Sequence, residues 1–397
     1  METITSLEAL VHATSSATGA ECIALPQVEA IDVKWNGMGV AEAQKFASAL
    51  ERGSFTRLKR INLYANYIGD AGAEALATAL GRGQFQALEC IDISWNRIGP
   101  VGAKALATVL EHVTLPQLKR LNFGCNIVGS DGLKAISAAL ERSSLQTLER
   151  IELNGNDIDE EGAKAFATAL KRGSFPQLQG IDLHGNKIGN EGAEALATAL
   201  EHGTLPKLSR IDLHRNRIGG CGAKALASAL ERGALPRLKC IDLDENCIGD
   251  EGAKAIASAL ERGSFQALES LDLGSNAIGP DGAKALASAL ERGSFPRLQL
   301  IYFRGNICGR EGIDAFVSAL RRASLPELEN SAFRVTIGPD DKTARRLQNA
   351  CACARQRGRM LLFLCAENGR CNSQAKRFLK RDGDHAAMTR ALKFMLP

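Results

Sequence analysis

Aromatic residues are scarce in this chain of 397 residues, because they make up 5% of the sequence and include only two tryptophans and three tyrosines. Apolar runs of about 18 residues or more, the length that a membrane-spanning helix needs, do not occur. The N-terminus, Met-Glu-Thr-Ile-Thr-Ser, has no basic region followed by an apolar core, and no Asn-x-Ser/Thr sequon is present. We therefore expect a cytoplasmic protein without a transmembrane segment, with the nucleus as the alternative location.

Motifs for catalysis are missing as well. No serine or cysteine is paired with histidine in a supporting motif, and the glycines follow a repeat rather than a phosphate-binding loop. We expect a protein that is not an enzyme, with no catalytic residues, no cofactor and no bound metal.

The dominant feature that is present is an asparagine at every thirtieth position, without insertion or deletion between the copies. The ten members of the series are Asn36, Asn66, Asn96, Asn126, Asn156, Asn186, Asn216, Asn246, Asn276 and Asn306. The surrounding unit reads L-x-x-I-x-L-x-x-N-x-I-G, followed by G-A-x-A-L-A-x-A-L. Its first half alternates apolar and polar residues and predicts a short strand. Its second half places Leu76 and Leu80 on one stripe and predicts a helix.

This unit resembles the leucine-rich repeat family, and the glycines at Gly72 and its equivalents are similar to the ribonuclease-inhibitor subtype. The resemblance implies an α/β right-handed solenoid, a horseshoe with parallel strands on the concave face and helices on the convex face. We expect about ten 30-residue repeats over residues 28–327, an N-terminal cap at residues 1–27, and a degenerate last repeat with a capping or flexible tail at 328–397.

Several positions have predicted structural roles within the unit. The resemblance implies that the asparagine side chain bonds the backbone of neighbouring coils. Asp70, Ser130, Asn190 and Asp250 fall just before the predicted helices, where a short polar side chain caps the first N–H groups, and Pro100 and Pro280 fill the same position. Glycines that follow the helices predict left-handed stops. They are Gly83, Gly173, Gly203, Gly233, Gly263 and Gly293.

Charge and cysteine are unevenly spread. The net charge of +4 combines a basic segment, residues 331–397 with 14 Lys/Arg and 5 Asp/Glu, with a mildly acidic remainder. That segment suits nucleic acid, an anionic surface or the acidic repeats, or is a solvated end. The cysteine total of 11 is odd and favours reduced thiols. The spacing of Cys351, Cys353, Cys365 and Cys371 does not match the usual zinc motifs.

Candidate partner-binding residues are those that vary inside the fixed template. Four are aromatic residues of the first three repeats, Trp35, Tyr64, Tyr67 and Trp95, which suit interface anchors or pack across strands. His184, His214 and Asp244 share one column of successive strands, beside a row of aspartates at Asp182, Asp212, Asp242 and Asp272. We read this column as a solvated face or a site for a basic partner, with a divalent metal as a lesser alternative. Arg215 and Arg304 complete the candidate set.

Three functions are compatible with these observations. The first is a non-enzymatic scaffold that binds a macromolecular partner, a small GTPase or a basic protein, on the concave face. The second follows from the similarity of the repeats to Ran GTPase-activating proteins. The third is a regulatory or sensing protein, because the repeats also resemble the sensing arm of NOD-like receptors.

Overall fold

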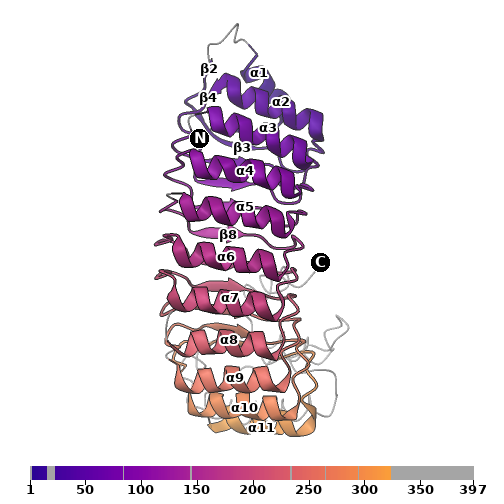
Figure 1. The fold of residues 1–397 in the computed structure, drawn as a ribbon, viewed down its shortest axis with the longest axis vertical. Coiled ribbons are helices and arrows are strands. Elements are labelled where there is room, and N and C mark those ends of the chain that lie inside the picture. Colours follow the sequence, from indigo (N-terminus) through magenta and orange to yellow (C-terminus); the bar gives the residue numbers. More distant parts are fainter. Residues whose placement is uncertain are drawn as a thin grey trace, which may run out of the picture.

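The computed structural model describes residues 2–15, 23–83, 85–143, 145–232, 235–263, 265–293 and 295–322. These residues form a stack of strand–helix coils, with the helices in one layer and the strands in another (Figure 1). The predicted tail with Cys351, Cys353, Cys365 and Cys371 lies outside the described residues. The elements are β1 (Glu2–Ile4), α1 (Leu7–Ala13), β2 (Ile23–Ala24), β3 (Val28–Asp32), α2 (Val40–Arg52), β4 (Gly53–Ser54), β5 (Arg60–Asn62), α3 (Gly69–Arg82), β6 (Cys90–Asp92), α4 (Pro100–His112), β7 (Arg120–Asn122), α5 (Gly129–Arg142), β8 (Arg150–Glu152), α6 (Glu160–Arg172), β9 (Gly180–Asp182), α7 (Gly189–His202), β10 (Arg210–Asp212), α8 (Gly220–Glu231), β11 (Cys240–Asp242), α9 (Gly249–Arg262), β12 (Ser270–Asp272), α10 (Pro280–Arg292), β13 (Leu300–Tyr302) and α11 (Gly309–Arg322).

One parallel sheet runs through the whole described array. Its 11 strands follow the order β1-β3-β5-β6-β7-β8-β9-β10-β11-β12-β13, and a second sheet pairs β2 with β4. From β3 onward the pairing joins equivalent positions of successive repeats, as in Ile61↔Ile91 and Asp212↔Asp242. The predicted α/β solenoid is therefore confirmed. Because helices are wider than the strand spacing, such a stack bends with its strands on the inside.

The core lies between the two layers. In the second repeat, Ile61 and Leu63 of the strand segment meet Leu76 and Leu80 of α3, and each of the four is at most 1% exposed. The residues that alternate with Ile61 point outward, so each three-residue strand presents its first and third side chains on the face away from the helices. We call this outward surface the strand face.

The repeated asparagines hold neighbouring coils together, as expected. Asn126 Nδ2 donates to the carbonyl oxygens of Ile93 in the preceding coil and Phe123 in its own. Its Oδ1 accepts from the backbone N–H groups of Asn96, at 2.9 Å, and Ile98, at 3.0 Å. The buried amide of Asn126 is thus satisfied on both sides, whereas Oδ1 of Asn96 and of Asn216 has no hydrogen-bond partner within the described residues.

The prediction about helix capping was wrong in its detail. Asp70 lies inside the first turn of α3, and its Oδ1 accepts from Gly99 N and Gly102 N, at 2.7 and 2.8 Å, at the start of α4. Asn190 and Asp250 likewise cap the helix of the following repeat. Neighbouring helix starts lie close enough in the stack for one side chain to reach the next helix. Pro100 and Pro280 do begin their helices, α4 and α10.

The glycines after the helices are not left-handed stops. Gly83, Gly173, Gly203, Gly263 and Gly293 have φ between −73° and −81° in extended backbone, and Gly233 lies outside the described residues. Space explains most of them: a Cβ on Gly83 would lie 2.2 Å from the Phe85 ring, which is buried under the return segment. The sequence signal was real, but its cause is close packing.

The structural repeat spans two sequence repeats. After the asparagine, one repeat turns through a left-handed residue at the next position, such as Arg97 or Arg217, whereas the following repeat turns at the third position, at Gly129 or Gly249. The polar capping residues, which recur every 60 positions, follow this alternation. That spacing was the sequence signal for a two-repeat unit.

The described part of the N-terminal segment adds one further strand and helix to the stack. Strand β1 pairs in parallel with β3, and the side chains of Ile4 and Leu10 are buried. Among the helices of the described ranges, none is long and apolar enough to span a membrane. Six cysteines lie in these ranges, and all six are free thiols there.

Candidate functional site

The strand face ends in a turn whose first residue is left-handed in every repeat. The residue just before each asparagine has φ between +49° and +68° in all ten copies, and its identity varies: Trp35, Ala65, Trp95, Cys125, Gly155, Gly185, Arg215, Glu245, Ser275 and Gly305. We call these ten residues the turn column. A left-handed backbone costs a non-glycine residue roughly 1–2 kcal/mol. Glycine avoids this cost in three copies, whereas the other seven copies carry a larger residue in the same backbone conformation.

Two of those larger residues are tryptophans that face solvent. Trp35 is 70% exposed and Trp95 is 55% exposed. The Trp35 ring meets the edge of Tyr64 with a centroid distance of 5.3 Å, and Tyr67 is also 55% exposed. We call Trp35, Tyr64, Tyr67 and Trp95 the aromatic patch. Tyr64 is half-buried, and the role of the four residues in binding stays a prediction. The sequence did not indicate that Arg97 stacks its guanidinium 4.7 Å from the centre of the Tyr67 ring.

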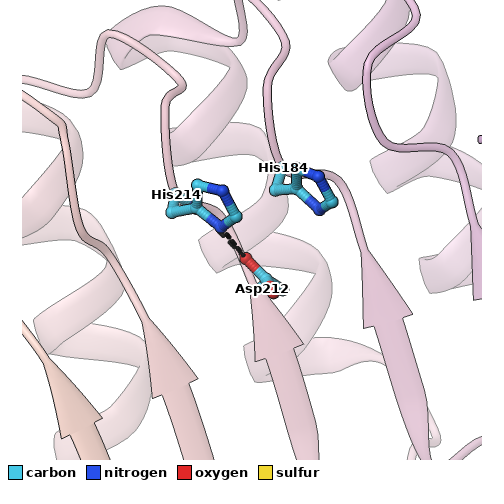
Figure 2. Close-up of side chains that lie close together, drawn as sticks. All are labelled: His184, Asp212 and His214. Atoms are coloured by element: carbon cyan, nitrogen blue, oxygen red, sulfur yellow. Dashed lines mark hydrogen bonds and ion pairs between the residues drawn. The ribbon is translucent and has the colours of Figure 1, made fainter. Parts of the chain in front are cut away.

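The second candidate cluster lies in the middle of the array. His184 and His214 follow strands β9 and β10, and their rings stack with a centroid distance of 4.3 Å and an interplanar angle of 9° (Figure 2). Each ring bonds the aspartate two residues earlier, since Nδ1 lies 2.8 Å from Oδ1 in both His184–Asp182 and His214–Asp212. The structure therefore aligns the two histidines as the repeat spacing predicted.

Carboxylates run across four strands below these rings. Asp182, Asp212, Asp242 and Asp272 pair in register across β9 to β12, and we call them the aspartate row. The row is unevenly compensated. Asp182 and Asp212 receive histidine bonds, and Arg210 Nη2 lies 3.6 Å from Asp212. Within the described residues, no lysine or arginine forms a salt bridge with Asp242 or Asp272.

The electrostatics of the row follow from this difference. Burial raises the pKa of Asp272 to about 7, and the charges of Asp242 and Asp244 add to the effect against a backbone bond from Gly274. Burial also raises the pKa of Asp242, with Asp212 as the next contributor. Burial opposes ionisation of Asp212 too, but there the hydrogen bond and charge of His214 prevail and the pKa is lowered. The half of the row without histidines is therefore the half that resists ionisation.

Asp244 and Arg304 form a pair that bridges two repeats. Arg304 Nη2 lies 3.1 Å from Asp244 Oδ2, across Gly274. The glycine makes this possible, because a Cβ there would lie 2.4 Å from Asp244 Oδ1. Asp244 keeps only 9% of its side chain exposed, and its Oδ1 has no hydrogen-bond partner within the described residues.

Arg215 is also occupied. Its Nε and Nη2 lie 2.6 and 2.7 Å from the carboxylate oxygens of Glu245, the equivalent residue of the next repeat. The sequence identified Arg215 as a candidate without its partner, although both belong to the turn column. The structure thus brings the candidates together in two separate groups, the aromatic patch near the N-terminus and the His–Asp cluster with its arginines further along.

Comparisons with known proteins agree with the repeat architecture. A family model described as "Leucine Rich repeat" matches residues 86–107, 115–137, 144–167, 178–197, 235–257 and 266–287. No curated protein matches the sequence. The family model describes leucine-rich repeats in general, so the ribonuclease-inhibitor subtype stays a prediction.

Solved structures with a similar arrangement are distant. An internalin from Listeria monocytogenes is 15% identical, with 79% of this chain and 87% of that chain covered and a TM-score of 0.39. The yeast complex of Rad7 and Elc1 contains a chain with 14% identity, coverage of 84% and 67%, and a TM-score of 0.47. Actin-binding site 2 of leiomodin-1 is 19% identical over 41% of this chain and 88% of that chain, with a TM-score of 0.33. With its 30-residue register, its continuous parallel sheet and six family-model matches, this chain is a leucine-rich repeat protein.

Proposed function

We propose that this protein is a non-enzymatic protein-interaction module that binds a macromolecular partner on its strand face. The observation that carries the proposal is the pair of exposed tryptophans, Trp35 and Trp95, in left-handed backbone. Glycine fills equivalent positions at lower cost, and neither tryptophan contributes to the core. Stability alone does not account for them, whereas a role as interface anchors does.

The surroundings of the tryptophans suit such a role. Both sit on a backbone that is bonded to the next coil, with Trp35 N donating to Tyr64 O at 3.0 Å and Trp95 N to Gly124 O at 2.9 Å. Rigid aromatic side chains lose little conformational entropy on binding, and they offer both apolar area and one polar group. The edge contact between Trp35 and Tyr64 further limits the motion of these two rings.

In the experiment, the intact chain and variants of it capture partners from source cytosol, and the captured proteins are identified by quantitative mass spectrometry. In the test variant Trp35, Tyr64 and Trp95 are replaced by alanine. The matched control replaces two other exposed apolar residues, Val101 and Ile307, which are 56% and 68% exposed. We expect the test variant to lose its partner with an unchanged circular dichroism spectrum, and the control to keep it.

Other outcomes would assign partner binding to a different part of the protein. If the aromatic variant keeps every partner that the intact chain captures, the aromatic patch is not the binding surface. A version ending at Glu327 addresses the basic segment beyond the described residues, and a partner lost only from that version would assign binding to the tail. Recovery of a small GTPase would direct attention to the similarity with Ran GTPase-activating proteins, which a GTP hydrolysis assay then tests.

A further inference from the structure

We propose that His184, His214 and Asp212 bind one divalent transition-metal ion of the zinc class on the strand face. This site lies away from the aromatic patch and does not depend on the proposed function. The spacing of these residues in the sequence matches no known ligand motif, so the sequence alone indicated a metal only as a lesser alternative. The solenoid supplies the proximity that the linear sequence does not show.

The three side chains lie close enough together to share one ion. One ligand atom from each of the three residues lies within 4.8 Å of the other two. In a tetrahedral zinc site, ligands about 2.0–2.1 Å from the ion are roughly 3.3 Å apart. His214 Nδ1 and Asp212 Oδ1, at 2.8 Å, must separate slightly, while the stacked rings must tilt from their present 9° so that both face one point. Only the side chains need to move, and the strands that carry these residues can stay in place.

The donor atoms of these residues are also of the kind that zinc binds. Figure 2 shows His214 directing a ring nitrogen at Asp212, with the His184 ring parallel beside it. The Nδ1 atom of each ring faces the aspartate row, as its 2.8 Å contact with Asp182 or Asp212 shows. An ion that replaces the protons on these two nitrogens would be bound by one nitrogen from each imidazole and by a carboxylate oxygen of Asp212. Imidazole with carboxylate is a set that zinc and its neighbours in the first transition series favour.

The charge around these residues is mainly negative. Besides Asp212, the carboxylates that face this point are Asp182 on β9 and Asp242 on β11, whose Oδ2 lies 4.0 Å from His214 Nδ1. The opposing cation is Arg210, at 3.6 Å from Asp212 Oδ2 and with 62% of its side chain exposed. Asp244, in the column of the histidines, is compensated by Arg304, whose Nη2 lies 3.1 Å from Asp244 Oδ2. A dication would offset this excess of negative charge.

The two histidines are also accessible from solvent. The side chains of His184 and His214 are 32% and 25% exposed, so an ion can enter from solvent without opening the core. Asp182 Oδ1 lies 2.8 Å from His184 Nδ1, so an ion bound to that nitrogen would replace this contact and leave the Asp182 carboxylate beside it. Three protein ligands leave a coordination position open to water or to a group from a partner.

The test is a titration of the intact chain, stripped of metal with a chelator, with Zn²⁺ by calorimetry and with Co²⁺ by absorption spectroscopy. We expect a site with one Co²⁺ per chain, with visible ligand-field bands and without the near-ultraviolet band of thiolate ligands. The absence of the thiolate band distinguishes the proposed site from any metal binding by the cysteines at 351–371. Affinity should fall as the pH is lowered, because protons compete with the ion for the imidazole nitrogens.

Variants decide whether these residues are responsible. We expect His184→Ala combined with His214→Ala to abolish the nitrogen-ligated site, and Asp212→Asn to weaken it at least tenfold. The matched control, His112→Ala with His202→Ala, removes two histidines on the helical side and should bind as the intact chain does. An unchanged nitrogen-ligated site in the 184/214 variant, or no such site in the intact chain, would overturn the proposal. Circular dichroism of each variant shows whether loss of binding reflects loss of fold.

Discussion

Replacing Asp272 with asparagine should stabilise the protein at alkaline pH and leave its stability at acid pH almost unchanged. The carboxyl group lies in the aspartate row beside Asp242, and its pKa in the folded protein is raised to about 7, chiefly by burial. Asparagine has nearly the same shape, and its side-chain oxygen can still accept from Gly274 N, which lies 2.9 Å from Asp272 Oδ1. The substitution therefore removes the charge while preserving the local contact.

The sign of the effect follows from proton binding. In the unfolded chain an aspartate ionises near pH 3.9. Because the folded pKa of Asp272 is higher, between pH 4 and 7 the folded state holds the proton that the unfolded state has released. Stability therefore declines as the pH rises through this window and stays reduced above it. The variant lacks the group and escapes this decline.

The magnitude comes from the size of the shift. A rise in the pKa of Asp272 from 3.8, the ordinary value of an aspartate, to about 7 sets a ceiling near 4 kcal/mol on the gain in unfolding free energy, at about 1.4 kcal/mol for each tenfold change in proton affinity. The expected gain is smaller than this ceiling, because part of the Asp272 side chain reaches solvent and because Asp242 and Asp244 can adjust their positions when Asp272 is neutral. We expect a gain in unfolding free energy of about 1–3 kcal/mol at pH 8.5 and close to zero at pH 4.

Urea unfolding followed by circular dichroism at several pH values measures this difference. Asp32→Asn is the matched control, because Asp32 holds the equivalent position in the first repeat but has a cation, with Lys34 Nζ 3.4 Å from its Oδ2. That variant should not gain stability at alkaline pH. A stability difference for Asp272→Asn that does not change with pH would refute the argument, since it would show that the carboxylate is not destabilised by its surroundings.

Three further predictions concern the repeat framework. Trp95→Gly should be more stable than Trp95→Ala by about 1 kcal/mol in urea unfolding, because only glycine occupies the left-handed turn position without strain; equal stabilities would argue against strain there. Asp70→Ala should cost about 1 kcal/mol and increase hydrogen exchange at the start of α4 rather than α3, whereas the exposed Asp131→Ala should do neither. Asn126→Ala should lower the unfolding free energy by about 2–4 kcal/mol in thermal or urea unfolding, because it leaves buried backbone groups of two coils unpaired. A loss below about 0.5 kcal/mol would show that the asparagine hydrogen bonds do not hold neighbouring coils together.

Local signals in the sequence were right about position more often than about cause. The glycines after the helices were correctly singled out, but the ring of Phe85 at Gly83, rather than a left-handed backbone, excludes a side chain there. Asp70 was correctly identified as a cap, but it serves the next helix. The two errors have different origins. A pattern within a single repeat does not contain the neighbouring coil, whose helix Asp70 caps. Phe85 belongs to the same coil as Gly83, and its ring lies against that glycine because it is buried in the core.

The candidate site shows the same division. The column of His184, His214 and Asp244 could be predicted, because a constant repeat length places equivalent residues on adjacent strands. The pairing of Arg304 with Asp244, two repeats away, could not, because it depends on the absence of a side chain at Gly274 and on the reach of one arginine. Nor could the pairing of Arg215 with Glu245 be distinguished from a free guanidinium.

The sequence by itself determined the architecture of this protein, because an unbroken 30-residue register of apolar residues and asparagines allows only one stack that buries every strand and helix. It also determined which residues are free to vary. The tertiary structure decided how those variable residues act on one another: which carboxylates gain histidines, which remain uncompensated, and which aromatic residues stay exposed. The physical reason is that the core depends on a pattern repeated in every coil, whereas the strand face depends on distances and charges between individual side chains in different coils.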